Sequence, residues 1–196
     1  MDATSQTYWN NRWLTQETGW DMGHASPPLI RFAQQLADKD ISILIPGCGN
    51  AHEAVYLLDN GFTNITLLDI SPLLVNDLIK RFFPYINKGL QVICDDFFDH
   101  RGQYDLILEQ TFFCALHPSL RNAYVKHMHE LLRPHGVLAG LLFNKEIPDG
   151  PPFGGTEAEY KLLFQSLFSI QEMEPCEDSI TPRVGSELFF ICHKKH

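Results

Sequence analysis

Two glycines and an aspartate are the residues of this sequence whose types and spacing best suit chemistry. Gly47 and Gly49 flank Cys48 directly after an apolar run, and Asp69 ends the next apolar run, twenty-two residues after Gly47. Glycine adopts backbone angles closed to other residues and lets a ligand approach the main chain. An acidic side chain at that distance can accept hydrogen bonds from both hydroxyls of a ribose. The spacing therefore predicts a site for an adenosine group.

The residue at position 52 bears on which adenosine cofactor is bound. A dinucleotide fingerprint needs a third glycine there, so that a helix can approach a pyrophosphate closely, and this chain has His52. The methionine part of S-adenosylmethionine needs polar backbone groups and no pyrophosphate cradle. The motif therefore favours S-adenosylmethionine over a nicotinamide dinucleotide. The alternative for the glycines is a tight turn between packed elements, without a ligand.

More polar and aromatic residues follow the next two apolar runs. Asp96 and Phe97 follow the first of them, and Glu109 and Gln110 follow the second. In open α/β sheets, ligands bind at the carboxyl ends of the strands. Asp96 can accept the adenine amino proton there, and Phe97 can pack on the base. The alternative is a solvated turn with Phe97 in the core.

These motifs belong to an alternation of strands and helices that continues to the end of the chain. The predicted strands are residues 41–45, a run ending at 69, 90–94, 104–108, 137–143, 170–173 and 187–193, and the predicted helices are 51–60, 72–83, 118–132 and 156–168. This order indicates an α/β fold: a three-layer αβα sandwich around a doubly wound, seven-stranded, mostly parallel sheet. The last two strands are placed to form an antiparallel hairpin at its edge.

The first thirty residues and the loop 144–155 remain outside the predicted elements and suit a lid. All three tryptophans of the chain, Trp9, Trp13 and Trp20, precede the first predicted strand. Trp9 and Trp13 share one face of a helix, and aromatic faces attract a sulfonium cation. The alternative is an amphipathic helix that simply docks on the domain. We expect a single domain over 1–196, with a lid at 1–30 and a Rossmann-like core at 41–196.

Composition restricts the partners of the protein. The chain has 196 residues, is 44% hydrophobic and carries a formal net charge of −9. Because no basic run could follow a phosphate backbone, nucleic acid is not expected as a partner. The polar N-terminus lacks the apolar core of a signal peptide, and no segment has the length and hydropathy of a membrane span. We therefore expect a cytoplasmic monomer or weak homodimer that acts on a small molecule.

Neither the cysteines nor the histidines predict a metal site. The five cysteines include no CxxC pair, which argues against a disulfide framework and a zinc knuckle. His127 and His129 lie two apart on a predicted helix, so they point in different directions and are expected on the surface. His24, in a loop near the predicted site, is instead a candidate proton acceptor.

The order and spacing of several motifs together resemble the thiopurine S-methyltransferase family, and most closely its halide and thiol methyltransferase branch. The resemblance covers nearly the whole chain. The matching motifs are Trp9-x3-Trp13, Trp20-Asp21-x-Gly23, Ile45-Pro46-Gly47-Cys48-Gly49, Leu68-Asp69-Ile70-Ser71, Asp96-Phe97, Phe112-Phe113-Cys114-Ala115-Leu116 and Leu131-Leu132-Arg133-Pro134-His135-Gly136.

The resemblance implies a class I methyltransferase that uses S-adenosylmethionine and acts on small soft nucleophiles such as thiols, hydrosulfide, thiocyanate or halides. By matching position it implies these roles: Trp9, Trp13 and Trp20 close over the cofactor, Gly47 and Gly49 meet its methionine part, Asp69 holds the ribose, and Asp96 with Phe97 holds the adenine. Gln110 also matches a cofactor-contacting position, which is commonly tyrosine in the halide branch and arginine in the thiopurine branch. Its departure from both leaves the acceptor open.

Methyl transfer from a sulfonium demands mainly alignment and exclusion of water, so no catalytic residue is assigned with certainty. We expect the acceptor pocket to be lined by residues 20–28, Phe112, Phe113 and residues 151–153. His24 or Glu109 could act as a helpful but dispensable base.

Other functions stay open from the sequence. A thiopurine S-methyltransferase acting on aromatic thiols and a non-catalytic S-adenosylmethionine-binding protein are the alternatives to the leading hypothesis. A nucleotide-dependent oxidoreductase is disfavoured by His52, and an arsenic or selenium methyltransferase by the lack of a cysteine cluster.

Overall fold

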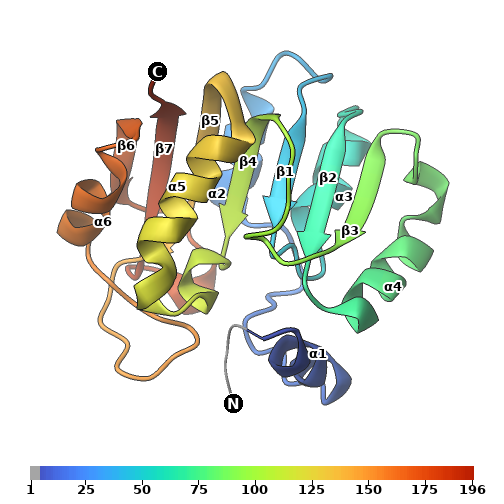
Figure 1. The fold of residues 1–196 in the computed structure, drawn as a ribbon, viewed down its shortest axis with the longest axis horizontal. Coiled ribbons are helices and arrows are strands. Elements are labelled where there is room, and N and C mark those ends of the chain that lie inside the picture. Colours follow the sequence, from blue (N-terminus) through green and yellow to red (C-terminus); the bar gives the residue numbers. More distant parts are fainter. Residues whose placement is uncertain (1–4) are drawn as a thin grey trace.

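The computed structural model describes residues 5–196 and contains a seven-stranded sheet in the order β3-β2-β1-β4-β5-β7-β6 (Figure 1). Its strands are β1 (Ile43–Pro46), β2 (Ile65–Asp69), β3 (Leu90–Cys94), β4 (Tyr104–Gln110), β5 (Leu132–Phe143), β6 (Phe168–Pro175) and β7 (Glu187–Lys194). β1 to β5 pair in parallel, whereas β7 runs antiparallel to both β5 and β6. This topology confirms the predicted α/β class, including the closing antiparallel hairpin.

Helices cover both faces of the sheet, with α5 crossing its front in Figure 1. The helices on the faces are α2 (Pro27–Gln34), α3 (His52–Asp59), α4 (Pro72–Arg81), α5 (Arg121–Leu131) and α6 (Glu157–Phe164), whereas α1 (Gln6–Leu14) lies below the strand ends in Figure 1. Local sequence fixes several starts. Ser71 accepts a hydrogen bond from the Leu74 N–H ahead of α4, and Thr156 with Glu159 forms a capping box at α6.

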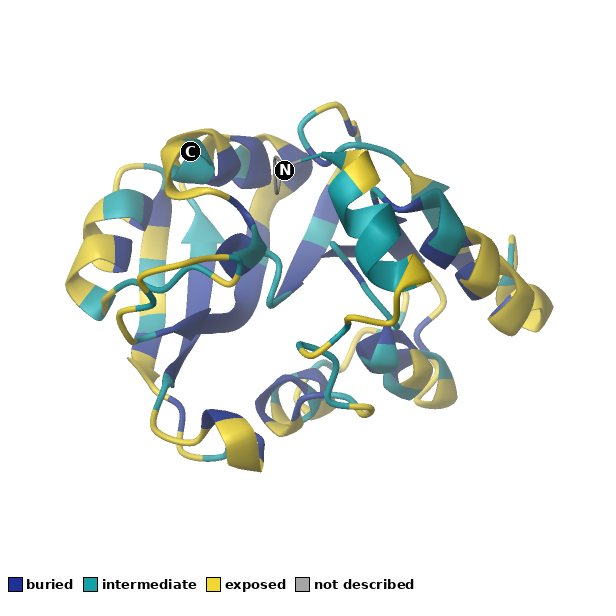
Figure 2. Ribbon diagram, turned by 90° about the horizontal axis from the view of Figure 1, so that it is seen from below, coloured by how far each residue is buried: buried dark blue, intermediate teal, exposed yellow. Residues whose placement is uncertain are grey.

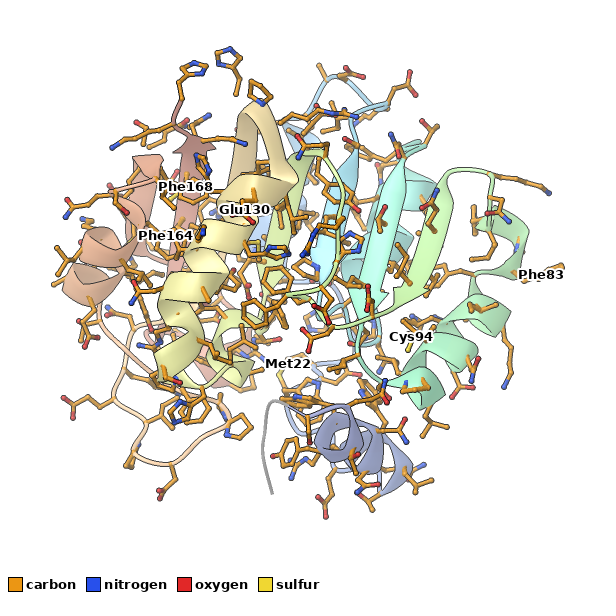
Figure 3. All side chains as sticks on the ribbon, in the orientation of Figure 1. Met22, Phe83, Cys94, Glu130, Phe164 and Phe168 are labelled. Atoms are coloured by element: carbon orange, nitrogen blue, oxygen red, sulfur yellow. The ribbon has the colours of Figure 1, made fainter. Side chains whose placement is uncertain are left out.

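Alternate residues of the central strands face two separate apolar layers. Ile43 and Ile45 of β1 belong to a cluster that includes residues of α2, α3 and α4, whereas the intervening Leu44 belongs to one that includes residues of α5 and α6. Phe164 and Phe168, labelled in Figure 3, lie in this second cluster. Burial on both faces explains why these strands read as continuous apolar runs.

Several predicted bounds and one predicted exposure differ from the structure. α6 ends at Phe164 rather than at residue 168, and β6 begins at Phe168 rather than at residue 170. β4 extends through Gln110, and β5 begins at Leu132 rather than at residue 137, with a register shift between Tyr104 and Leu106. His127 is buried rather than on the surface, because α5 directs it against Phe97, with ring centroids 4.8 Å apart.

Only part of the predicted lid, residues 1–30, lies outside the core of the domain. Residues 1–4 lie outside the described residues. α1 docks beside α4, where the Asn10 side-chain oxygen accepts hydrogen bonds from the Ser71 hydroxyl and the Leu73 N–H, each at 3.0 Å. α2 belongs to the core, since Leu29 is buried, so the described segment outside the core spans residues 5–26. Between residues 5 and 196, no helix is long and apolar enough to cross a membrane.

Candidate functional site

The carboxyl ends of the parallel strands and the segment 5–26 lie at the same side of the molecule. Figure 2 shows this side, viewed from below. A cavity of about 700 Å³ lies there and is lined by residues from both. Figure 3 places Met22, one of the lining residues, between the strand ends and α1. Because β1 to β4 all end at this edge, the loops that follow them meet in one place, as the sequence predicts.

The loop after β1 forms part of the cavity wall. Gly47 and Gly49 have φ angles of +55° and +51°, which glycine adopts at low cost. A Cβ at Gly47 would lie 2.3 Å from the Phe112 ring, so only glycine fits beneath that ring. The Cys48 N–H donates to the Leu68 carbonyl at 3.1 Å, which ties the loop to β2. The glycines therefore set a fixed surface in which backbone, not side chain, faces the cavity.

Asp69 ends β2 beside this loop and is buried. One of its carboxylate oxygens accepts the Gly49 N–H at 3.2 Å, and the other accepts the Ser71 N–H at 3.0 Å. Burial raises the pKa of Asp69 to about 6, although these N–H groups lower it. The Ile70 N–H also bonds this carboxylate, and the residue lines the cavity. A carboxylate has about four acceptor positions, so Asp69 keeps acceptor capacity toward the cavity.

Asp96 and Phe97, after β3, both line the cavity. Asp96 accepts the Phe98 N–H at 2.8 Å, which shapes the turn. The Phe97 ring is buried, with its centroid 5.0 Å from that of Phe112 and 5.7 Å from that of Tyr124. Phe97 is therefore a core residue, as one sequence interpretation expects, and it is also part of the cavity wall, where its contact with an adenine stays a prediction.

The three tryptophans gather into one cluster over the glycine loop. The Trp20 ring meets Trp9 and Trp13 edge to face, at centroid distances of 5.4 and 5.8 Å. Trp13 lies nearest the loop, 3.9 Å from the position of a Cβ at Gly49. The Arg12 guanidinium covers Trp20 at 5.5 Å. All three rings line the cavity, so this docked segment also encloses it.

Two contacts on either side of the sheet centre fasten this segment. Asp21 accepts hydrogen bonds from the side chains of Asn50 and His52, the latter at 2.7 Å. Although burial opposes it, these bonds and that from the Gly23 N–H hold the pKa of Asp21 below its usual value. From the loop before β7, Arg183 donates to the Trp20 carbonyl at 2.7 Å. The segment therefore bridges both halves of the sheet.

Glu109 and Phe113 do not line the cavity, which corrects their assignment to the acceptor pocket. Glu109 is fully buried and accepts the N–H groups of Phe112 at 2.8 Å and Phe113 at 3.1 Å, and the Tyr124 hydroxyl at 2.6 Å. Burial raises its pKa to about 7, although these donors lower it. Because β4 continues through position 110, Glu109 points inward and supports the loop from below.

Gln110, Phe112 and His24 do line the cavity. The Gln110 side-chain oxygen is buried without a hydrogen-bond partner among residues 5–196. His24 is exposed, and its Nδ1 lies 2.9 Å from the Ala25 carbonyl. Of the predicted 151–153 wall, Pro151 and Pro152 lie in the lining, while the Phe153 N–H donates to the Cys114 carbonyl at 2.6 Å.

Comparison with known proteins identifies the family. A model of the thiopurine S-methyltransferase family matches residues 4–189. The protein named "Probable thiol methyltransferase 2" of Arabidopsis thaliana is 31% identical over 192 residues, covering 95% of this chain and 84% of its own. Thiocyanate methyltransferase 1 of Brassica oleracea is 30% identical, over 91% of this chain and 81% of its own. The chain belongs to the thiopurine S-methyltransferase family.

As a member of this family, the protein is an S-adenosylmethionine-dependent methyltransferase. Solved structures of lower identity show the same fold. A Burkholderia thailandensis 1,6-didemethyltoxoflavin-N1-methyltransferase superposes with a TM-score of 0.77 at 19% identity, covering 99% of this chain and 88% of its own. Magnesium protoporphyrin IX methyltransferase from Synechocystis gives a TM-score of 0.78 at 13% identity, covering 100% of this chain and 98% of its own.

The residues of the site fit the family's cofactor. Asp69 offers acceptors for a ribose diol, and the backbone of Gly47 and Gly49 leaves the wall beside it open. The unpartnered oxygen of Gln110 needs a donor, which the ammonium group of a methionine moiety would supply. Burial of Asp69 and the aromatic cluster both favour a cationic ligand over a diphosphate.

Sequence reasoning gave no individual role to two cations of the cavity lining, Arg183 and Lys145, the latter falling only within the predicted lid loop 144–155, and none to Asp21. Asp21 carried a signal, because it stands in the Trp20-Asp21-x-Gly23 motif. Neither cation carried one, because each stands in a polar loop at no recurring distance from the other motifs. Only the fold brings them to the cavity.

Proposed function

We propose that this methyltransferase acts on small soft nucleophiles, namely a thiol, hydrosulfide, thiocyanate or a halide, by in-line displacement. The observation that carries the proposal is the continuity of the cavity. The same cavity is lined by Asp69 and Gly47 and by apolar residues that include Phe112, Leu116 and Phe143. A cofactor held at the first end would direct its reactive group toward a compartment suited to a polarisable acceptor.

The proposed roles follow the wall from one end to the other. When bound, S-adenosylmethionine supplies a methyl group on a positively charged sulfur, which is already an activated leaving group. We assign the ribose to Asp69, the adenine to Asp96 and Phe97, and the methionine part to the glycine loop and Gln110. Trp9, Trp13 and Trp20 close over the bound cofactor and exclude water.

The proposed methyl acceptors need little help from a general base. Thiolates and halides attack without losing a proton, whereas a free alkyl thiol, with a pKa of about 8.5, must lose its proton before it attacks. Glu109 is buried below the loop and is not offered as a base. His24 lines the cavity and is exposed, so it is the residue that could take a proton from a neutral thiol.

Other aspects of the proposal concern the state of the protein. We propose a single methyltransferase domain over 1–196, with a lid at its N-terminus. It acts as a cytoplasmic monomer or weak homodimer without a nucleic-acid partner. The net charge of −9 supports the last point. Light scattering at micromolar concentration tests the oligomeric state, and fractionation of cells tests the location.

One experiment tests the proposed activity. S-adenosylmethionine is incubated with the protein and, separately, hydrosulfide, thiocyanate, iodide, thiophenol and a thiopurine, and the methylated products are measured. Transfer to at least one of the first four supports the proposal. Transfer to the thiopurine alone would favour the thiopurine type. Binding of S-adenosylmethionine by calorimetry, with transfer to none, would indicate a non-catalytic binding protein.

A further inference from the structure

The carboxylates that line the cavity all come from one part of the sequence. They lie in the half of the lining contributed by residues 8–98: Asp21, Glu53, Asp69, Asp95 and Asp96. The half contributed by residues 110–183 of the described chain holds no carboxylate and two cations, Lys145 and Arg183. The first half also holds Arg12, which pairs with Glu17 at 3.1 Å, so the five carboxylates leave this half suited to a cationic cofactor. The second half includes the apolar walls of the proposed acceptor compartment, and its charged residues are cations only.

Of these two cations, Arg183 is already neutralised within the protein. It is buried, and its guanidinium lies 3.3 Å from the carboxylate of Glu187, which is also buried. A second nitrogen of the same group donates to the Trp20 carbonyl. Because its charge and donors are committed to the fold, Arg183 contributes little net charge to an acceptor.

Lys145 is the uncompensated cation. Its ammonium group forms no ion pair within residues 5–196 and lies 4.9 Å from the centroid of the Phe143 ring, another lining residue. The main chain at its root is fixed, because the Gly155 N–H donates to the Lys145 carbonyl at 3.0 Å. The Lys145 side chain is thus a flexible cation on an anchored main chain, and it borders an apolar compartment.

We propose that Lys145 determines acceptor specificity by selecting thiols that carry a carboxylate in addition to the reacting sulfur. This inference rests on the proposed function. The thiol first loses its proton to solvent or to His24. The thiolate sulfur then forms the new bond to the methyl carbon, and the electron pair of the broken bond remains on the cofactor sulfur, leaving S-adenosylhomocysteine. The carboxylate is unchanged throughout and pairs with the Lys145 ammonium group. A thiol bearing an ammonium group meets repulsion at the same place.

The test uses three thiols of similar size: 3-mercaptopropionate, 2-mercaptoethanol and cysteamine. Besides the thiol they carry a carboxylate, a neutral hydroxyl and an ammonium group, respectively. Because the thiols differ in intrinsic reactivity, kcat/KM is compared between variants for each thiol. Lys145→Met should lower the value for 3-mercaptopropionate about fivefold and leave 2-mercaptoethanol unchanged. Lys145→Glu should lower it further and raise the value for cysteamine, whereas Lys145→Arg should retain the wild-type order.

Lys88 supplies the matched control, because it is an exposed lysine outside the cavity lining. Lys88→Met should leave all three values unchanged. The inference would be overturned if Lys145→Met changed kcat/KM equally for the three thiols. It would also be overturned if Lys145→Glu kept the wild-type order of kcat/KM among them.

A binding measurement separates this inference from the proposed function. 3-(Methylthio)propionate is titrated calorimetrically into protein saturated with S-adenosylhomocysteine. Weaker binding to Lys145→Met than to the wild type supports the charge preference even if no thiol is methylated, an outcome that would contradict the proposed function alone. Equal binding to both proteins would overturn the inference.

Discussion

The Arg183 guanidinium donates a hydrogen bond to the main-chain carbonyl of Trp20 at 2.7 Å, joining residues 163 positions apart. The same guanidinium pairs with buried Glu187 at 3.3 Å. One side chain thus holds the N-terminal segment to the loop before β7. This bond fixes the backbone of Trp20, while Trp9, Trp13 and Arg12 pack against its ring.

Replacing Arg183 with methionine should destabilise the protein by about 3 kcal/mol, because Glu187 would remain buried without its partner. Chemical denaturation measures this loss. The double variant Arg183→Met/Glu187→Met should recover most of the stability, since well-packed apolar pairs replace buried ion pairs at little cost. It should still bind S-adenosylmethionine about 3- to 10-fold more weakly, through loss of the Trp20 anchor. Wild-type affinity in the double variant would contradict the anchoring role.

Glu109 should make stability depend on pH. Its pKa is raised to about 7 in the folded protein, against an ordinary value of 4.5. The folded state therefore binds the proton more tightly, so this contribution to stability is full below pH 4.5 and is lost as the pH rises to about 7. The loss amounts to about 3 kcal/mol.

Glu109→Gln tests this dependence, because glutamine keeps the shape and an acceptor oxygen without the titration. As the pH rises from 4.5 to 7, the wild type should lose unfolding free energy relative to the variant, which has no group that titrates at this position. Urea titrations at several pH values measure it. A difference that stays constant across this range would show that Glu109 does not titrate there.

Asp69→Ala should weaken S-adenosylmethionine binding by about 1–3 kcal/mol through loss of charge-assisted hydrogen bonds to the ribose. Isothermal calorimetry measures the affinity. Asp77→Ala is the matched control, because Asp77 is an exposed acid that pairs only with Lys80 in the described chain. An unchanged affinity of Asp69→Ala for S-adenosylmethionine would contradict the assignment of the ribose to Asp69.

Trp20→Ala should affect cofactor retention and turnover more than folding, because its ring is half-buried and faces the cavity. We expect a Kd for S-adenosylmethionine raised about tenfold and a melting temperature lowered by only a few degrees. Leu14→Ala, at an exposed position of α1, is the control. A collapsed melting temperature with intact kinetics in the folded fraction would mean that the tryptophan cluster only docks the segment.

Much of the fold was predictable because its signals are local. The strand at Leu90–Cys94 matches its predicted bounds, since an apolar run between turn residues carries its own limits. The start of α4 follows from Ser71-Pro72, where the cap lies beside the helix that it serves. β5 was predicted too short because pairing with Tyr104, a tertiary contact, extends it to Leu132.

The candidate site was predictable to the extent that it lies at strand ends. Gly47, Asp69 and Asp96 follow parallel strands, so topology alone brings them to one edge. The direction of Glu109 was not predictable, because it depends on whether β4 continues past residue 108. His127 was misplaced for a similar reason: an isolated helix pattern does not reveal that Phe97 covers that position.

The sequence by itself determined the fold class and the family, and it placed the proposed adenosine site at the strand ends, because these depend on short-range patterns of glycine, acid and apolar residues. Only the tertiary structure decided which charges the acceptor meets. Lys145 and Arg183 look equivalent in the sequence, yet Glu187 neutralises one and no described residue pairs with the other. The physical reason is that the net charge at a point depends on all neighbours in space, and folding alone assigns them.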